Sequence, residues 1–117
     1  MALPHPMPEE LVELIARRMR VLGEPTRIRL LDHLRDGEQS VNELASRSGV
    51  GQQNVSKHLG VMTEAGILAR RKAGNHVYYR IVDDSALLLC EQVCGSVTER
   101  LRTLSAAVTG QAPQGAR

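Results

Sequence analysis

The chain has very few aromatic residues: 117 residues include no Phe, no Trp and two Tyr. Its core must therefore be packed with aliphatic side chains, and a chain of this length is expected to form one domain. The sequence also has no long apolar run and no secretory signal, so we expect a soluble, cytoplasmic protein with no membrane partner. Two cysteines in such a chain argue against a framework of structural disulfides.

The motifs of common enzyme classes are also missing. There is no Gly-rich phosphate loop, no H-E-x-x-H zinc motif and no G-x-S-x-G nucleophile elbow. Cys90 and Cys94 are one residue too far apart for a C-x-x-C redox motif. We therefore do not expect an enzyme.

Charge is distributed unevenly although the formal net charge is only +2. Residues 41–80 carry six bases against two acids, a net of +4, whereas residues 81–99 carry four acids and no base, a net of −4. A basic segment of this kind is typical of a surface that meets nucleic acid.

Residues 40–66 have the pattern of two helices joined by a short turn. The second helix is expected to begin after Gly51, and Val55, Leu59 and Met62 recur at spacings of four and three, which gives one buried stripe. No acid occurs between residues 52 and 63. The side chains that we expect away from the stripe, able to bond base edges or phosphates, are Gln52, Gln53, Asn54, Ser56, Lys57 and His58. The alternative is an ordinary solvated polar face.

The first helix of the pair has clear signals at both ends. Ser40 and Glu43 have the S-x-x-E spacing of a capping box, which satisfies free backbone donors at a helix start. Gly49 can end the helix because it adopts positive φ without a Cβ clash. Gly66 is expected to end the second helix in the same way. Helix, tight turn and helix in this order predict a helix-turn-helix.

Residues 67–82 change to a strand pattern. Leu68–Lys72 and His76–Val82 flank a turn cluster of Ala73, Gly74 and Asn75. The hairpin carries the polar and basic side chains Arg70, Arg71, Lys72, Asn75, His76 and Arg80. Alone it would be an ordinary charged edge hairpin, which needs such residues to avoid aggregation. Directly after a helix-turn-helix it predicts a wing that contacts DNA.

The segments outside the helix-turn-helix predict three further helices. Residues 9–22 have an apolar face that includes Leu11 and Leu14. A second helix is expected to begin near Pro25, to bury Ile28, Leu31 and Leu34, and to close at Gly37. The last is expected from about Asp84 to Val108.

Apolar residues of the last helix alternate at spacings of three and four, which is a heptad seam. Its members are Leu87, Cys90, Cys94, Val97, Leu101, Leu104 and Val108. One small domain does not need so long a seam for its own core. We interpret it as one side of a homodimer interface, which packs beside the first helix of the partner.

These pieces resemble the ArsR/SmtB family of small dimeric transcriptional repressors, over roughly residues 10–105. The family's L-x-x-P-x-R pattern is matched by Leu22, Pro25 and Arg27. Its V-S-x-H-L-x-x-L pattern is matched by residues 55–59, with Met62 in place of the last leucine. Its G-x-x-x-x-Y pattern is matched by residues 74–79. The resemblance implies a mainly α, dimeric winged helix-turn-helix that binds a twofold-symmetric operator and releases it when an inducer binds.

The metal sites of the family are not intact in this chain. The arsenic-sensing branch has cysteines in the first helix of the pair, where this sequence has Ala45 and Ser46. The zinc-sensing branch has one histidine at the start of the last helix and another further along it, where this sequence has Ser85 and Ser96. The resemblance therefore names no ligand set here.

Cys90 and Cys94 are four residues apart and share one face of the last helix. They can be small buried apolar residues that only pack. They can also be a sensor of a soft metal or metalloid ion, or of an oxidant or reactive sulfur species. Two thiols alone do not complete a tetrahedral site, so the cofactor is either such an ion or none.

Three functional hypotheses remain open. The first is an inducible DNA-binding repressor, the second a ligand-independent regulator of the same fold, and the third a winged-helix module that binds an acidic protein. We expect residues 1–8 to be a flexible lead, residues 9–109 the domain with its dimerisation helices, and residues 110–117 a disordered tail.

Overall fold

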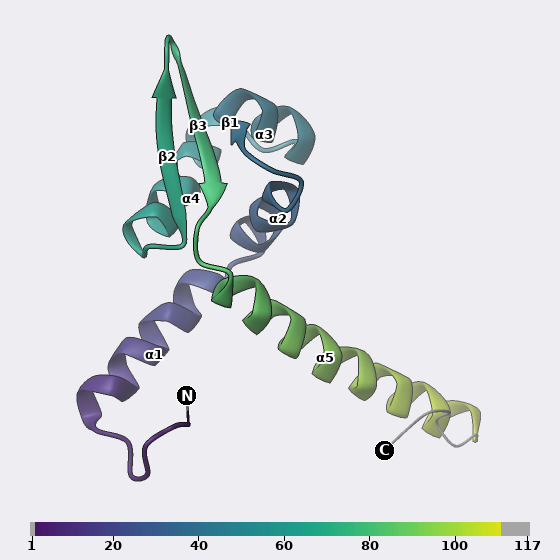
Figure 1. The fold of residues 1–117 in the computed structure, drawn as a ribbon. Helices are drawn as coiled ribbons and strands as arrows, with labels where there is room; N and C mark the ends of the chain where they lie inside the picture. The colour runs from purple at the N-terminus through teal and green to yellow at the C-terminus, as the bar shows by residue number, and fades with distance from the viewer. Residues whose placement is uncertain (1, 111–117) are drawn as a thin grey trace. The chain divides into compact units, whose positions relative to one another are not determined.

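The computed structural model describes residues 2–110, and eight elements lie along them (Figure 1). In chain order they are α1 (Glu9–Leu22), α2 (Pro25–Leu34), β1 (Gln39–Ser40), α3 (Val41–Ser48), α4 (Gln52–Glu64), β2 (Leu68–Ala73), β3 (His76–Ile81) and α5 (Ser85–Thr109). Contacts divide the chain into one unit that ends at Asp84 and a second that begins at Ser85. The predicted mainly α architecture with a winged helix-turn-helix is confirmed.

Local sequence signals set the helix boundaries of the first unit. The Ser40 hydroxyl accepts a hydrogen bond from the Glu43 backbone N–H at 3.1 Å, and the Glu43 carboxylate accepts one from the Ser40 N–H at 3.0 Å. This is the predicted capping box at the start of α3. Gly49 ends α3 at φ 73°, and Gly66 follows α4 at φ 80°. Both glycines adopt the left-handed conformation that their positions require.

The core of this unit is aliphatic, as the composition predicts. Val55, Leu59 and Met62 of α4 are each fully buried, so the predicted stripe is confirmed. The other buried apolar residues of the unit are Leu22, Leu30, Leu31, Leu34, Leu44, Ile67, Leu68 and Tyr79.

The predicted inner face of α2 was wrong at one position. Ile28 is 44% exposed, whereas Leu30 is fully buried beside Leu31 and Leu34. Arg27 precedes Leu30 and Leu31 by three and four residues, so it occupies the inward position of the preceding turn. Ile28 therefore lies to the side of the buried face.

Three antiparallel strands follow the order β1-β3-β2. The β2–β3 hairpin is the wing, and its tip projects beyond the helices of this unit (Figure 1). Ala73 pairs with His76, so the turn is Gly74-Asn75 alone, one residue shorter than predicted, with Gly74 at φ 61°. The sequence analysis did not anticipate β1, in which Gln39 pairs with Tyr79 and Ser40 with Tyr78.

The second unit consists of α5 within the described residues. Its bounds agree with the predicted helix to one residue. None of the described helices has both the length and the apolar character needed to cross a membrane. Of the predicted C-terminal tail, residues 111–117 lie outside the described part of the chain, as does Met1.

Candidate nucleic-acid interface

The second helix of the helix-turn-helix, α4, exposes the polar side chains that the sequence predicts. Gly51 is its N-cap, and the buried stripe turns the opposite face outward. Five predicted DNA contacts are exposed on this helix, namely Gln52, Gln53, Asn54, Ser56 and Lys57. Amide side chains in this position can bond adenine edges in two places, and a lysine can reach guanine or a phosphate.

His58 does not share this exposure. Its side chain is 15% exposed, and its Nδ1 lies 3.0 Å from Nη1 of Arg27 on α2. A carboxylate oxygen of Glu24 lies 3.8 Å from the same ring nitrogen. His58 therefore faces α2, and one of its ring nitrogens already contacts Arg27. The sequence had predicted that His58 would point outward with the other DNA contacts of α4.

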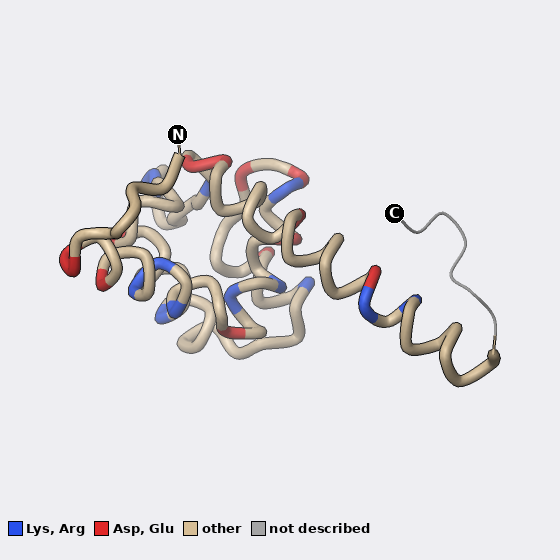
Figure 2. Tube along the Cα trace, turned by 90° about the horizontal axis from the view of Figure 1, so that it is seen from below, with Lys and Arg blue, Asp and Glu red and all other residues tan. Residues whose placement is uncertain are grey.

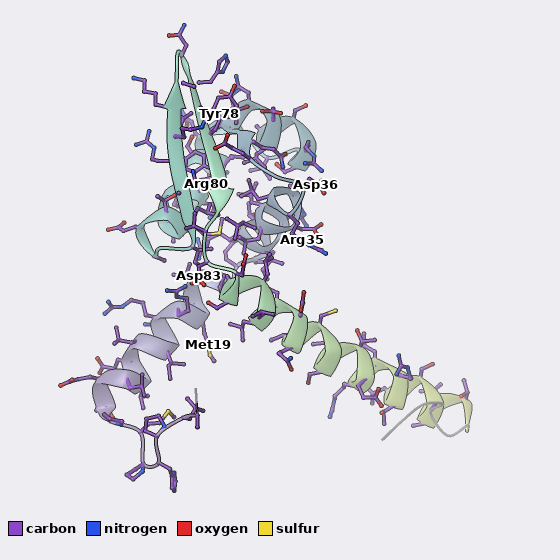
Figure 3. All side chains as sticks on the ribbon, in the orientation of Figure 1. Met19, Arg35, Asp36, Tyr78, Arg80 and Asp83 are labelled. Carbon is purple, nitrogen blue, oxygen red and sulfur yellow. The ribbon has the colours of Figure 1, made fainter. Side chains whose placement is uncertain are left out.

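The wing exposes all six of its predicted contacts, but the pleat divides them between two faces. Arg70 is paired with Tyr79 and Lys72 with Val77, so these four side chains share the face of the sheet that includes buried Leu68. Two basic side chains of the opposite face belong to Arg71 and Arg80. Tyr78 and Arg80 project from β3 in Figure 3. The basic residues that are adjacent in the sequence therefore form two separate groups, one on each face of the hairpin.

Arg71 is held by contacts within the protein. Its Nη2 donates to Glu38 Oε1 at 2.7 Å and its Nε to Glu38 Oε2 at 3.2 Å. The guanidinium lies 4.9 Å from the centre of the Tyr78 ring, a cation–π contact. The Arg71 hydrogen bonds lower the pKa of Glu38 and, in turn, raise the pKa of Arg71.

Hydrogen bonds of nearby polar side chains fix the ends of α2 and α3 and the segment between these helices. Arg47 of α3 donates to Gln39 Oε1 at 2.6 Å and to Asp36 Oδ2 at 2.6 Å. The hydrogen bond from Arg47 lowers the pKa of Asp36. The backbone N–H of Arg27 donates to the N-cap residue Glu24 and lowers the pKa of that carboxyl. The backbone hydrogen bond from Ser40 lowers the pKa of Glu43.

Sequence reasoning missed Glu38, Glu24 and the role of Arg27. Glu38 precedes a two-residue strand that has no pattern of its own, so nothing in the sequence placed it opposite Arg71. Arg27 stood out only as part of a motif, without a partner. The contact between Arg27 and His58 joins residues 31 positions apart, which no local pattern reveals.

The two cysteines lie on α5. Cys90 is half-buried and Cys94 is exposed, and both are free thiols. The Cys94 sulfur lies 4.0 Å from the hydroxyl of Thr98. Among residues 2–110, no cluster of three or more His, Cys, Asp or Glu side chains could hold a metal ion.

Large apolar side chains remain exposed on α1 and on α5. On α1 these include Leu14 and Met19, at 58% and 54% exposure, and Met19 extends from the helix in Figure 3. On α5 they include Val97, Leu101 and Leu104, which are 50–61% exposed. Most of α5 carries no charge, while bases and acids are interspersed along the first unit (Figure 2).

Known proteins are similar to this chain in sequence and in fold. A helix-turn-helix domain family matches residues 22–71. The biofilm growth-associated repressor of Agrobacterium fabrum is 35% identical over 89 residues, which are 76% of each chain. The HTH-type transcriptional repressor SmtB of Mycobacterium tuberculosis is 34% identical over 80 residues, which are 68% of this chain and 59% of SmtB. The alignment with that relative therefore spans less than two thirds of its length.

A solved structure agrees with the sequence relatives. The homodimeric winged helix-turn-helix DNA-binding domain of Mb0332 from Mycobacterium bovis, a possible ArsR-family transcriptional regulator, superposes with a TM-score of 0.71 at 28% identity. The match covers 86% of this chain and 94% of that domain.

Proposed function

This chain belongs to the ArsR/SmtB family of winged helix-turn-helix transcriptional regulators, and we propose that it is a sequence-specific DNA-binding repressor. The observation that carries this proposal is the exposed face of α4. The first turns of α4 present amide side chains, a hydroxyl group and a lysine, and they contain no acidic residue. The adjacent wing has four basic side chains. Because duplex DNA is a polyanion with donors and acceptors in its major groove, this surface suits it well.

Within this surface the residues have different tasks. Gln53, Asn54 and Ser56 would meet base edges from the start of α4, the part of such a helix that enters the major groove. Lys57 and the wing arginines meet phosphates, which gives affinity and register without sequence information. Arg70 and Lys72 would contact the backbone from one face of the wing and Arg80 from the other.

A second copy of the chain is the proposed partner of the apolar faces of α1 and α5. Support comes from their exposure in a single chain and from the homodimeric state of the Mycobacterium bovis domain. A dimer would present two α4 helices to half-sites one helical turn apart, about 34 Å. The expected interface residues are Leu11, Leu14, Leu87, Cys90, Cys94, Val97, Leu101 and Leu104.

An inducer, if the repressor has one, is proposed to act on Cys90 and Cys94. They are the only cysteines in the sequence, and both are free. A soft ion would bind their thiolates, and an oxidant or reactive sulfur species would modify them. The cytoplasm, where this regulator would meet its operator, keeps such thiols reduced. A ligand-independent regulator remains the second candidate because the same thiols can also serve only as packing residues.

A mobility-shift titration on the DNA upstream of the protein's own gene tests the proposal. We expect specific binding by the wild type, weaker binding by Gln53→Ala and Lys57→Ala, and wild-type binding by Gln92→Ala. Gln92 is an exposed control on α5 outside the heptad seam. Equal affinity for this DNA and a scrambled duplex would instead favour a winged-helix module that binds protein.

A further inference from the structure

The side chain of Arg27 joins three helices. Its Nε donates to the backbone carbonyl of Val21 at 2.6 Å, and its Nη2 to that of Arg20 at 3.4 Å. Both carbonyls belong to the last turn of α1, where helix geometry leaves backbone acceptors without a partner from a following turn. The Arg20 carbonyl also accepts from the Gly23 N–H at 3.3 Å. The third guanidinium nitrogen, Nη1, lies 3.0 Å from Nδ1 of His58 on α4. Arg27 itself is in the first turn of α2.

The base of this arrangement is well fixed. Glu24 caps α2 and accepts a hydrogen bond from the Arg27 backbone N–H at 2.9 Å. Pro25 follows at the first helical position, where its fixed φ suits the helix. The Arg27 backbone is therefore fixed at the start of α2, and its side chain extends from this fixed point to α1 and α4.

The Arg27 contact engages one ring nitrogen of His58. A guanidinium has donors only, so Nδ1 of His58 is the acceptor in this contact. Apart from this bond, no side-chain hydrogen bond in the described part of the chain links α4 to another helix. The remaining attachment of α4 through Val55, Leu59 and Met62 is apolar and non-directional.

We propose that Arg27 is a positioning residue which, through His58, fixes the rotation of α4 about its axis and so aims its exposed residues at base edges. This inference rests on the proposed DNA-binding function. Hydrogen bonds to base edges depend on position, whereas contacts to phosphates tolerate small displacements. Loss of the Arg27–His58 bond should therefore lower sequence discrimination more than total affinity for DNA.

The test compares the affinity for the operator with that for a scrambled duplex, for full-length protein at several salt concentrations. We expect Arg27→Gln and His58→Leu to lower this ratio by about tenfold while affinity for the scrambled duplex and the salt slope stay unchanged. His58→Asn should retain most of the ratio, because the asparagine Oδ1 can accept the Arg27 hydrogen bond in place of Nδ1. Asparagine has no counterpart of Nε2, so a retained ratio would show that the contact with Arg27 is the one that matters. Arg29→Gln, an exposed arginine of the same helix, is the matched control and should behave as the wild type.

The double variant distinguishes this role from two others. If Arg27 acts through His58, Arg27→Gln with His58→Leu should lose no more discrimination than either single change. Additive losses, or an unchanged ratio in both single variants, would overturn the proposal. A parallel fall for both duplexes with a smaller salt slope would make Arg27 a phosphate contact and would overturn it as well.

Two further outcomes are separable. If Arg27→Gln does not fold, as thermal denaturation would show, the comparison of His58→Leu with His58→Asn decides, and equal loss in both contradicts the proposal. If the wild type itself does not discriminate the operator from the scrambled duplex, the proposed DNA-binding function is wrong, and the role of Arg27 is wrong with it. The variant outcomes above contradict only the role of Arg27.

Discussion

Glu38 and Arg71 form a two-point ion pair at the wing, with nitrogen–oxygen distances of 2.7 and 3.2 Å. The side chain of Arg71 is half exposed and that of Glu38 is 29% exposed, so the pair lies at the surface. A phosphate that approaches Arg71 has to compete with this carboxylate. The predicted phosphate contact is therefore weakened in the free protein by a residue that also repels DNA.

Glu38→Gln should raise DNA affinity by up to about fivefold per subunit, the range expected for release from a surface ion pair. The salt slope should steepen by about one per subunit, because Arg71 released from Glu38 would make in full the phosphate contact that the ion pair weakens, and so displace one more counterion. Fluorescence anisotropy at several salt concentrations measures both. Asp32→Asn is the control, since it also removes one acid and frees one arginine, Arg35, away from the wing. An equal gain in both variants would show a general charge effect.

Loss of the capping box should destabilise α3. Ser40→Ala removes the acceptor of the Glu43 N–H and is expected to lower the free energy of unfolding by about 1 kcal/mol. Urea denaturation monitored by circular dichroism measures the change. Ser46→Ala, at an exposed position within the same helix, should stay within about 0.5 kcal/mol of the wild type. Similar losses in the two variants would deny a special role to Ser40.

Stability should fall in acid. The pKa values of Glu24, Asp36, Glu38 and Glu43 are all lowered in the folded chain, so the unfolded chain takes up protons first as pH falls. Their contribution is complete above the ordinary carboxyl pKa and is lost as pH falls through the lowered values. The urea midpoint should therefore be level from about pH 7 to 6 and drop below about pH 5. Glu43→Gln should have a lower midpoint at pH 7 and a shallower drop.

The oligomeric state depends on the exposed seam of α5 if the proposed interface is correct. Leu101→Glu would bury a charge without a partner in that interface and is expected to yield monomers or insoluble protein. Analytical ultracentrifugation distinguishes a monomer from a dimer. Gln92→Glu introduces the same charge outside the seam and should remain dimeric. A soluble Leu101→Glu dimer of wild-type stability would place the interface elsewhere.

The thiols can be tested by a double change. Cys90→Ser with Cys94→Ser should retain operator binding and should no longer release DNA in response to arsenite, Cd(II), Zn(II), peroxide or polysulfide. The double variant should not respond because serine has neither the soft donor nor the redox chemistry of a thiolate. Mobility shifts of the wild-type protein treated with each compound identify the class of inducer. Full release of the double variant by its inducer would return both cysteines to a packing role.

Much of the fold was predictable because its signals are local. The capping box at Ser40, the glycines at residues 49 and 66, and the buried stripe of α4 each depend on neighbours within a few residues. The exposed polar face of α4 followed from the same periodicity. Ile28 was an exception to the helical periodicity, because a charged residue, Arg27, occupies the inward position one turn before Leu30 and Leu31.

The partners of the charged residues were not predictable in this way. Glu38 meets Arg71 only because β1 pairs with β3 and β3 with β2, a relation that joins distant segments. His58 looks like its exposed neighbours in the sequence, yet its ring faces Arg27. The pleat of the wing also separated bases that are adjacent in the chain. Each of these facts depends on tertiary pairing, and periodicity along one element contains no such information.

Ser40 belongs both to β1, where it pairs with Tyr78 of the wing, and to the N-terminus of α3, which it caps. The wing and the first helix of the helix-turn-helix are thus joined by a shared residue, with no flexible linker between them. A protein surface connected in this manner adapts little on docking, so the duplex has to bend or change its groove width to meet α4 and the wing together. We therefore expect the operator to favour easily deformed pyrimidine–purine steps between the contacted bases, and stiff A-tracts at those untouched positions to weaken binding.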